Sequence, residues 1–227
     1  MNKLIIFDLD NTFYFYKTTH QIALNAVFEN QKIFDEYLSF EKNYTLSKTR
    51  VQKRLNSNPS KHSKLLYFKD MFEDKCQIKE ILKFEQIYWK TFIQKADINI
   101  ILNKFIREEK KENDLFILCT NQNTKIQLEK VNRWNLNFFD YIFTSEEVGY
   151  EKPSDQFFKF VTNSLSILFK NEYDFYAVGD DYENDIKYWE QKFNANGYII
   201  NNSTTKFVQK NNLIYTNFHM AINHIFK

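Results

Sequence analysis

Two carboxylates stand one residue apart in the segment Asp8-Leu9-Asp10-Asn11-Thr12. The stretch from Leu4 to Asp8 is short, mostly apolar and without alternation, which is typical of a strand buried on both faces. Ligands of a parallel sheet bind beyond the carboxyl ends of its strands, where two neighbouring anions suit a bound cation. A carboxylate can also attack phosphorus while a second carboxyl moves the proton. The motif therefore predicts phosphoryl chemistry, and a plain polar turn is the alternative.

A second acidic cluster, from Gly179 to Asp185, follows another apolar run. Magnesium prefers oxygen ligands and usually keeps several waters. Asp180 is the best candidate for a direct metal ligand. Asp185 is expected to bind the metal through a water molecule or to orient Lys152. Asp181 could be a further metal ligand or could equally cap the next helix. An acidic loop that only caps a helix is the plainer alternative.

Two further segments carry groups suited to phosphate. Thr120 and Asn121 end an apolar run, where a hydroxyl and adjacent backbone N–H groups can hold a phosphate oxygen. Lys152 and Pro153 precede a helix-like segment, and a lysine there can offset negative charge during phosphoryl transfer. Taken singly, a turn at Thr120 and a surface lysine at position 152 are the simpler interpretations.

The elements that would position these residues alternate between apolar strands and helix-like patterns. We expect strands at Leu4 to Asp8, Leu115 to Thr120, Tyr141 to Thr144, Phe175 to Val178, Gly197 to Ile200 and Leu213 to Tyr215. Helices are expected at Asn99 to Glu109, Thr124 to Trp134, Asp155 to Phe169, Asn184 to Phe193 and Asn217 to Phe226. This alternation predicts βαβ units and an α/β fold with a mainly parallel sheet.

The stretch from about Tyr14 to Lys95 breaks the alternation, because it contains helix-period patterns and no convincing strand. The expected helices are Thr18 to Glu29, Ile33 to Glu41, Leu46 to Leu55, His62 to Phe72 and Lys79 to Ile93. A clear break falls at residues 56–60. The sequence thus predicts an α/β catalytic core of residues 1–13 and 96–227, with an all-helical subdomain of residues 14–95 inserted after the first strand.

Together the four motifs resemble, in order and position, those of the haloacid dehalogenase superfamily. The resemblance implies a Rossmann-like core, a helical cap and a bound Mg²⁺. The implied catalytic residues are Asp8 as nucleophile, Asp10 as general acid and base, Thr120 and Lys152. The implied metal ligands are Asp8, Asp10 through its backbone carbonyl, Asp180 and Asp185. Two segments depart from the family pattern, namely Ser154-Asp155-Gln156 and Lys187-Tyr188-Trp189.

The resemblance predicts an enzyme, a magnesium-dependent phosphatase that hydrolyses a small phosphorylated metabolite (a nucleotide or sugar phosphate) through an aspartyl phosphate. Asn121 and Arg50 are expected to contact substrate. Arg50, Lys53 and Arg54 share one helix face by their spacing and could grip a second anionic group, although a solvated basic face is simpler. A phosphomutase or a catalytically silent regulatory relative are the alternatives, and a dehalogenase is disfavoured because it needs neither Asp10 nor a magnesium site.

Bulk composition limits the partners and the cellular location that we expect. The net charge of +2 gives no hint of a nucleic-acid surface. No apolar run approaches the ~20 residues that span a bilayer, and the N-terminal stretch is too short and too soon acidic for a signal peptide. We therefore expect a cytoplasmic protein. Cys76 and Cys119 show no metal-type spacing, and no disulfide is expected. The sequence leaves the oligomeric state open.

Overall fold

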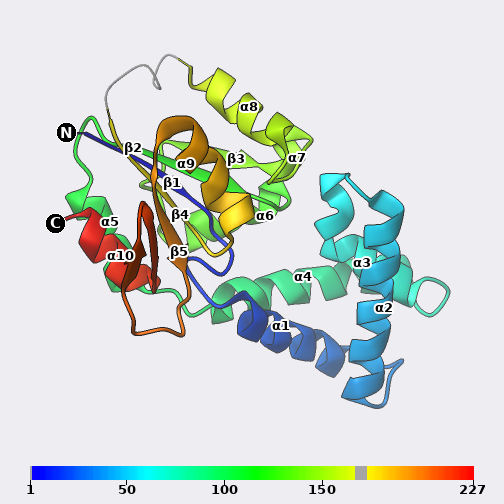
Figure 1. Cartoon of the computed structure of the whole chain (residues 1–227). Coiled ribbons are helices and arrows are strands. Elements are labelled where there is room, and N and C mark those ends of the chain that lie inside the picture. Colours follow the sequence, from blue (N-terminus) through cyan, green and yellow to red (C-terminus); the bar gives the residue numbers. More distant parts are fainter. Residues whose placement is uncertain (1, 167–172) are drawn as a thin grey trace. The chain divides into compact units, whose positions relative to one another are not determined.

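The computed structural model describes residues 2–166 and 173–227. The chain divides into two compact units, an α/β unit of Met1–Phe15 with Ile98–Lys227 and a helical unit of Tyr16–Asp97 (Figure 1). The sequence placed the two junctions after residues 13 and 95. No helix within the described ranges is both long enough and apolar enough to cross a membrane.

The α/β unit is built on one seven-stranded sheet in the order β3-β2-β1-β4-β5-β7-β6. All neighbouring strands are parallel except β6 and β7. The prediction of a mainly parallel α/β fold is confirmed. The strands are β1 (Asn2–Phe7), β2 (Leu115–Thr120), β3 (Tyr141–Thr144), β4 (Tyr173–Gly179), β5 (Asn196–Ile200), β6 (Val208–Lys210) and β7 (Leu213–Thr216).

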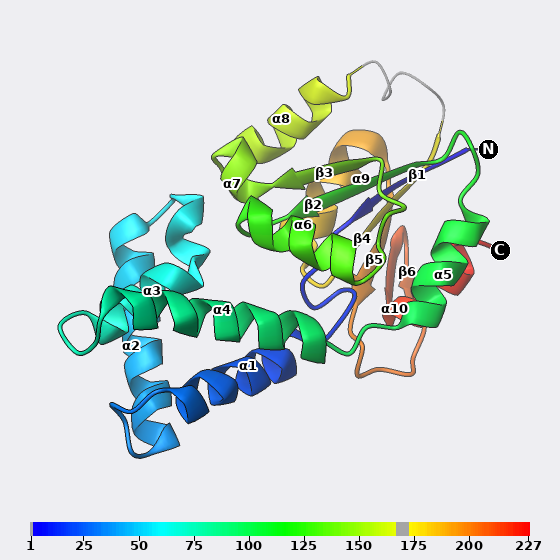
Figure 2. The ribbon, with the colours of Figure 1, turned by 180° about the vertical axis from the view of Figure 1, so that it is seen from behind.

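Helices cover both faces of this sheet, and Figure 2 shows α6 in front of it and α9 behind. The helices are α5 (Ile100–Glu109), α6 (Thr124–Arg133), α7 (Ser145–Val148), α8 (Asp155–Ser164), α9 (Lys187–Phe193) and α10 (Phe218–Ile225). Leu4 and Ile6 of β1 belong to the same buried cluster as Trp189 of α9. Phe7 instead contacts Phe116, with ring centroids 5.9 Å apart. Burial on both faces explains why the central strands read as unbroken apolar runs.

Two expected helices of this unit differ from the structure. The helix expected at Asp155 to Phe169 is described as α8 up to Ser164, and Phe169 lies outside the described residues. The helix expected at Asn184 to Phe193 is α-helical only from Lys187, where α9 begins. Asn184 itself lies in a π-helical turn, Tyr182–Ile186, that leads into α9. Such turns are frequent at functional sites, and this one carries Asp185.

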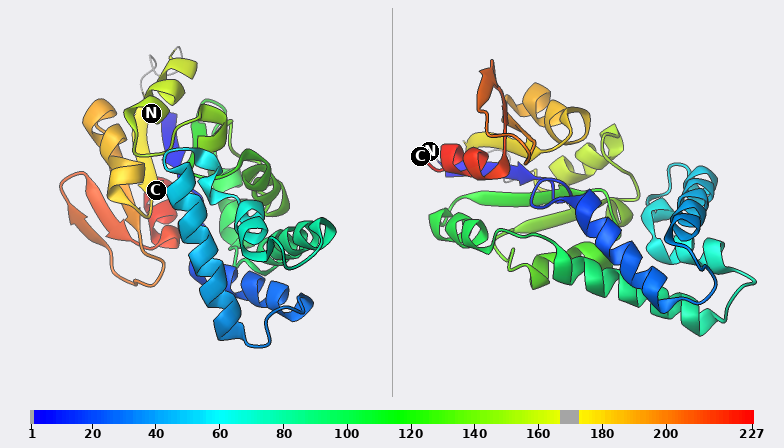
Figure 3. Two further views of the ribbon diagram at one scale, coloured as in Figure 1. Left: turned by 90° about the vertical axis from the view of Figure 1, so that its right-hand side faces the viewer. Right: turned by 90° about the horizontal axis from the view of Figure 1, so that it is seen from below.

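The helical unit contains α1 (Tyr16–Asn30), α2 (Tyr37–Leu55), α3 (Lys64–Phe72), α4 (Ile78–Lys95) and a 3₁₀ turn, Pro59–His62 (Figure 3). The expectation of separate helices at Ile33 to Glu41 and Leu46 to Leu55 was wrong. Residues 42–45 contain neither Gly nor Pro, and α2 runs through them. The Gln31 side chain accepts hydrogen bonds from the N–H groups of Ile33 and Phe34, which holds that segment in a turn instead.

Candidate active site

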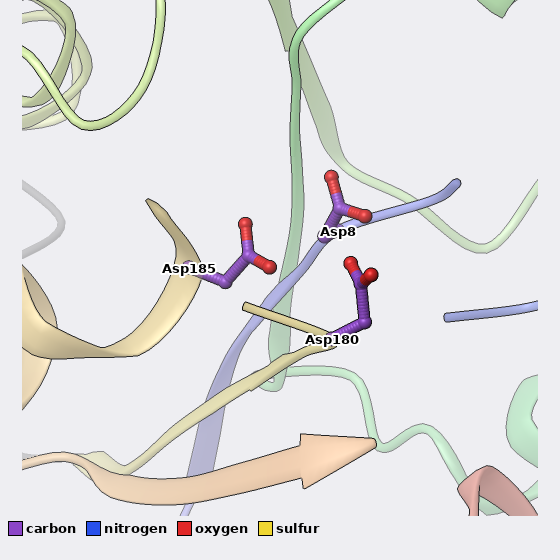
Figure 4. A group of neighbouring side chains, drawn as sticks. All are labelled: Asp8, Asp180 and Asp185. Carbon is purple, nitrogen blue, oxygen red and sulfur yellow. The ribbon is translucent and has the colours of Figure 1, made fainter. Parts of the chain in front are cut away.

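Three carboxylates of the α/β unit gather at the carboxyl ends of its central strands (Figure 4). Asp8 follows β1, Asp180 follows β4, and Asp185 comes from the π-helical turn after β4. One oxygen of each lies within 4.8 Å of the others. Because β1 and β4 are adjacent parallel strands, their ends bring together side chains that are more than 170 residues apart in sequence.

Lys152 connects two of these carboxylates. Its Nζ lies 2.8 Å from Oδ1 of Asp8 and 2.6 Å from Oδ1 of Asp185, and it donates to the backbone carbonyl of Cys119 at 2.7 Å. Burial alone would lower the pKa of Lys152, but the carboxylates of Asp185 and Asp8 raise it above its ordinary value. Lys152 is therefore a permanent cation at the site.

Asn121 fixes the backbone that carries Lys152. Its side-chain amide donates to the Lys152 carbonyl at 2.9 Å, and its Oδ1 accepts from the Lys152 N–H at 2.8 Å. Both polar atoms of the Asn121 side chain are thus engaged in positioning the lysine. Its expected contact with substrate stays a prediction.

Gly179 leaves the space that the Asp185 side chain occupies. A Cβ on Gly179 would overlap the Asp185 side chain, so only glycine fits at the end of β4. Oδ2 of Asp185 accepts from the backbone N–H of Asp181 at 3.0 Å. Oδ1 of Asp181 in turn accepts from the Asn184 N–H at 2.9 Å, so Asp181 caps the turn, one of the two roles considered for it.

A separate network surrounds Asp10. Lys130 Nζ lies 2.6 Å from Asp10 Oδ1, the Tyr14 hydroxyl donates to the same oxygen, and Gln127 Nε2 donates to Oδ2 at 3.3 Å. Gln127 Nε2 also lies 2.6 Å from Thr120 Oγ1. Burial tends to raise the pKa of Asp10, but the charge of Lys130 and these hydrogen bonds hold it below its ordinary value. At neutral pH Asp10 is a carboxylate.

Sequence reasoning missed Gln127 and Lys130. Both lie on α6 three residues apart, and both are completely buried beside Ile126 and Val131. The available signal was their position within the apolar stripe of the helix, where a lysine is rarely placed without a buried partner.

The remaining expected residues fall into two groups. A cavity of about 150 Å³ is lined by Asp8, Asp10, Thr120, Asn121, Lys152, Asp180, Asp181, Asn184 and Asp185. It thus brings together all the expected site residues of the α/β unit. Arg50 belongs to the helical unit, where it pairs with Asp70 at 2.5 Å and donates to Ser47 Oγ at 2.9 Å. Arg54 lies 3.7 Å from the same Asp70. A role for Arg50 in substrate binding stays a prediction.

The electrostatics of this cavity favour a cation. Burial raises the pKa of Asp8 well above its ordinary value, Lys152 opposes the rise, and the neighbouring carboxylates add to it. Burial and the charge of Asp185 likewise raise the pKa of Asp180 to about 6. A positive ion relieves this mutual repulsion, and carboxylate oxygens are hard ligands. The acidic triad of Asp8, Asp180 and Asp185, of which Asp8 and Asp185 are buried, therefore fits a metal ion.

Residues 2–188 match the family model of haloacid dehalogenase-like hydrolases. The chain belongs to this hydrolase family. A ribulose-1,5-bisphosphate 5-phosphatase from Halopiger xanaduensis is 28% identical over 193 residues, which cover 82% of this chain and 80% of the relative. Membership agrees with the resemblance inferred from the four motifs.

Solved structures of haloacid dehalogenase-like proteins share the fold. The HAD-hydrolase YfnB from Bacillus subtilis, bound to magnesium, is 18% identical with a TM-score of 0.65, over 99% of this chain and 98% of that one. A 2-haloacid dehalogenase from Pseudomonas syringae pv. tomato is 16% identical with a TM-score of 0.65, over 100% of this chain and 98% of that one. At these identities the likeness concerns the fold alone.

Proposed function

We propose that this hydrolase is a magnesium-dependent phosphatase that cleaves small organic phosphate monoesters, sugar phosphates in particular, through a phosphorylated Asp8. The observation that supports this most strongly is the different pairing of two neighbouring carboxylates. Asp8 shares Lys152 with a second carboxylate, Asp185, whereas Asp10 pairs with Lys130 and accepts from Tyr14 and Gln127. One carboxylate, Asp8, lies among excess negative charge that a bound cation can balance. The other is held in one orientation beside it.

In the first half-reaction, an oxygen of Asp8 attacks phosphorus and the ester P–O bond breaks. Lys152 binds Oδ1 of Asp8 at 2.8 Å, and Oδ2 has a long contact of 3.4 Å with Thr12 Oγ1. Oδ2 is therefore the better placed nucleophile. Protonated Asp10 gives its proton to the leaving oxygen, because an arriving phosphate dianion raises the pKa of a nearby carboxylate.

In the second half-reaction, Asp10 accepts a proton from water as that water attacks phosphorus. The bond between phosphorus and Asp8 breaks, which releases inorganic phosphate and restores the Asp8 carboxylate. Lys152 balances charge throughout. Thr120, whose Oγ1 is fixed by Gln127, is placed to bind a phosphoryl oxygen.

The residues that would hold Mg²⁺ are Asp8, Asp180, the backbone carbonyl of Asp10 and, through water, Asp185. When bound, the ion neutralises charge on the phosphoryl oxygens. Both oxygens of Asp185 already accept hydrogen bonds, from Lys152 and from the Asp181 N–H, which supports an indirect role. The magnesium in the related YfnB structure is consistent with this proposal.

The relative from Halopiger supports a sugar phosphate as the substrate, since it is named a ribulose-1,5-bisphosphate 5-phosphatase. The helical unit would act as the cap that selects the substrate and excludes water. A panel of phosphorylated sugars, polyols and nucleotides, assayed with Mg²⁺ by release of inorganic phosphate, tests the substrate class. Ribulose 1,5-bisphosphate belongs at the head of that panel.

The decisive experiment separates Asp8 from Asp10. With p-nitrophenyl phosphate, whose leaving group needs no proton, the Asp10→Asn protein should accumulate a phosphoenzyme, because its breakdown still needs a base. Intact-mass measurement after acid quench would show one added phosphate. The Asp8→Asn protein should be folded, inactive and free of that added mass. An Asp8→Asn protein that turns over like wild type, or carries the label, would refute the assignment.

A further inference from the structure

A second and larger cavity adjoins the candidate site within the α/β unit. Its volume is about 630 Å³, within the range of small-molecule pockets. Its walls come from the loop after β1, from β5 and β7, and from the residues between β5 and β6. Asp180 lines both this cavity and the 150 Å³ cavity around Asp8. A molecule with its phosphate at Asp8 can therefore extend past Asp180 into the larger space.

The walls of this cavity contain one cation. Among its described lining residues only Asp180 and Lys206 are charged, and the others are amides, hydroxyls, aliphatic groups and two aromatic rings. Lys206 is exposed, and its ammonium group makes no ion pair with the residues that the structure describes. The rings belong to Phe15 and Tyr215, each 42% exposed. The cavity thus carries an acidic group at the end that meets the reacting site and a basic group elsewhere.

The wall that carries Lys206 is tied to the loop that carries Asp10. The side-chain amide of Asn202 donates to the carbonyl of Thr12 at 3.0 Å and to that of Asn11 at 3.3 Å. Its Oδ1 accepts from the Phe218 N–H at 3.0 Å, which joins the loop to α10. The Lys206 N–H donates to Thr204 Oγ1 at 3.1 Å. These bonds fix the cavity wall relative to the reacting carboxylates.

We infer that this cavity is the leaving-group subsite of the enzyme, and that Lys206 binds a second anionic group on a hydroxylated substrate. The inference rests on the proposed phosphatase function and deepens it. The reacting phosphate lies at Asp8, the hydroxylated chain passes between the amide and hydroxyl groups of the walls, and a second phosphate or a carboxylate meets Lys206. Selectivity for doubly anionic substrates then arises in the α/β unit itself, from a residue outside the four motifs.

The test compares two substrates that differ only in the second anion, ribulose 1,5-bisphosphate and ribulose 5-phosphate, with p-nitrophenyl phosphate as a third. Lys206→Met should raise KM for the bisphosphate about 10-fold, the usual loss when a hydrogen bond to a charged group is removed. It should leave kcat/KM for the other two substrates within about 2-fold, because surface substitutions away from bound groups have small effects. Lys206→Arg should retain most of the preference.

Lys210→Met is the matched control, since Lys210 is an exposed lysine of the neighbouring β6 that does not line the cavity. Equal KM values for the bisphosphate in wild type and Lys206→Met, with p-nitrophenyl phosphate still hydrolysed, would overturn the subsite and leave the phosphatase proposal intact. An equal loss in Lys210→Met would point to general surface charge and also overturn it. A wild-type protein that hydrolyses none of the three substrates would reject the proposed function, and the subsite with it.

Discussion

Replacement of Lys130 by Met tests whether the network on α6 prepares Asp10 for proton transfer. The Lys130 side chain is fully buried and that of Asp10 is 21% exposed, with 2.6 Å between Nζ and Oδ1. Methionine is close to lysine in length and flexibility, so the substitution removes the charge with little change in volume. Asp10 would keep its bonds to Tyr14 and Gln127 and lose its only ion-pair partner among the described residues.

The expected loss of stability follows from the burial of the pair. Removal of one partner from a buried ion pair typically costs about 3–5 kcal/mol, because the other charge is left uncompensated. The partial exposure of Asp10 and its two remaining hydrogen bonds place the expectation near 3 kcal/mol, which corresponds to a melting temperature about 6–12 °C lower for a chain of this size. The double variant Lys130→Met/Asp10→Asn should recover part of that loss, since no unpaired charge remains.

The kinetic effect should depend on the leaving group. A misplaced Asp10 loses much of the 10²–10⁴-fold that general acid catalysis contributes. For an alkyl phosphate, kcat/KM, which reports phosphorylation of Asp8, should fall about 100-fold. For p-nitrophenyl phosphate the fall should be much smaller, because nitrophenolate leaves without a proton. A merely structural role for Lys130 would lower both values alike.

Lys125→Met supplies the control on the same helix, because the Lys125 side chain is 83% exposed and its one ion pair among the described residues is a long i,i+4 contact with Glu129. It should leave stability and both kcat/KM values near wild type. A Lys130→Met protein that matches Lys125→Met in melting temperature and in the ratio of alkyl to aryl phosphate activity would refute this role for Lys130.

Three further outcomes are expected from other parts of the chain. Chelation should abolish phosphatase activity, and Mg²⁺ should restore it. Mg²⁺ should also raise the melting temperature of wild type more than that of Asp180→Asn. Full activity after exhaustive chelation would exclude the proposed metal site. Gly179→Ala should cost about 1–3 kcal/mol of stability, measured by urea unfolding, and should lower activity, because the new methyl group displaces Asp185. Gly149→Ala is the comparison, since nothing lies within 4 Å of its Cβ position and the strain there is in the backbone. Burial and the charges of Lys64 and Lys48 lower the pKa of His20 to about 3, so the folded protein keeps this residue neutral and loses stability as pH falls from about 6.5. Between pH 7 and pH 5 wild type should lose about 2 kcal/mol more than His20→Gln, and parallel urea curves for the two proteins would contradict this.

The sequence was most informative where burial is uniform. β2 has the bounds that its apolar run predicted, because all of its residues are buried and both faces of a central parallel strand are covered. β3 also has its predicted bounds, although it is an edge strand and its first residue, Tyr141, is exposed. β6 was not expected, since Val208, Gln209 and Lys210 are all exposed and show no pattern. An edge strand of three residues is specified by its antiparallel pairing with β7, which local sequence does not encode.

The candidate site likewise contains residues that the sequence predicted and residues that it did not. Each of the four motifs is a short continuous segment that follows a strand. Their convergence at one edge of the sheet could therefore be expected from topology alone. The contacts of Gln127 and Lys130 with Asp10 depend on how α6 packs against the loop after β1, more than 110 residues away in sequence. Packing of that kind has no local signature beyond a polar residue on an apolar helix face.

The distribution of buried cations supports the different tasks that we propose for Asp8 and Asp10, two carboxylates separated by one residue. Lys130 and its neighbours hold the Asp10 carboxylate below its ordinary pKa, so its side chain needs no metal to remain ionised. Asp8 and Asp185 both pair with the ammonium group of Lys152, and Asp180 adds a third carboxylate, so this cluster has excess negative charge. Rebalancing that excess requires further positive charge, which Mg²⁺ would provide while a phosphate is bound. Under the proposed mechanism, the metal would therefore bind at the Asp8 side chain, and Asp10 would be left free to move protons.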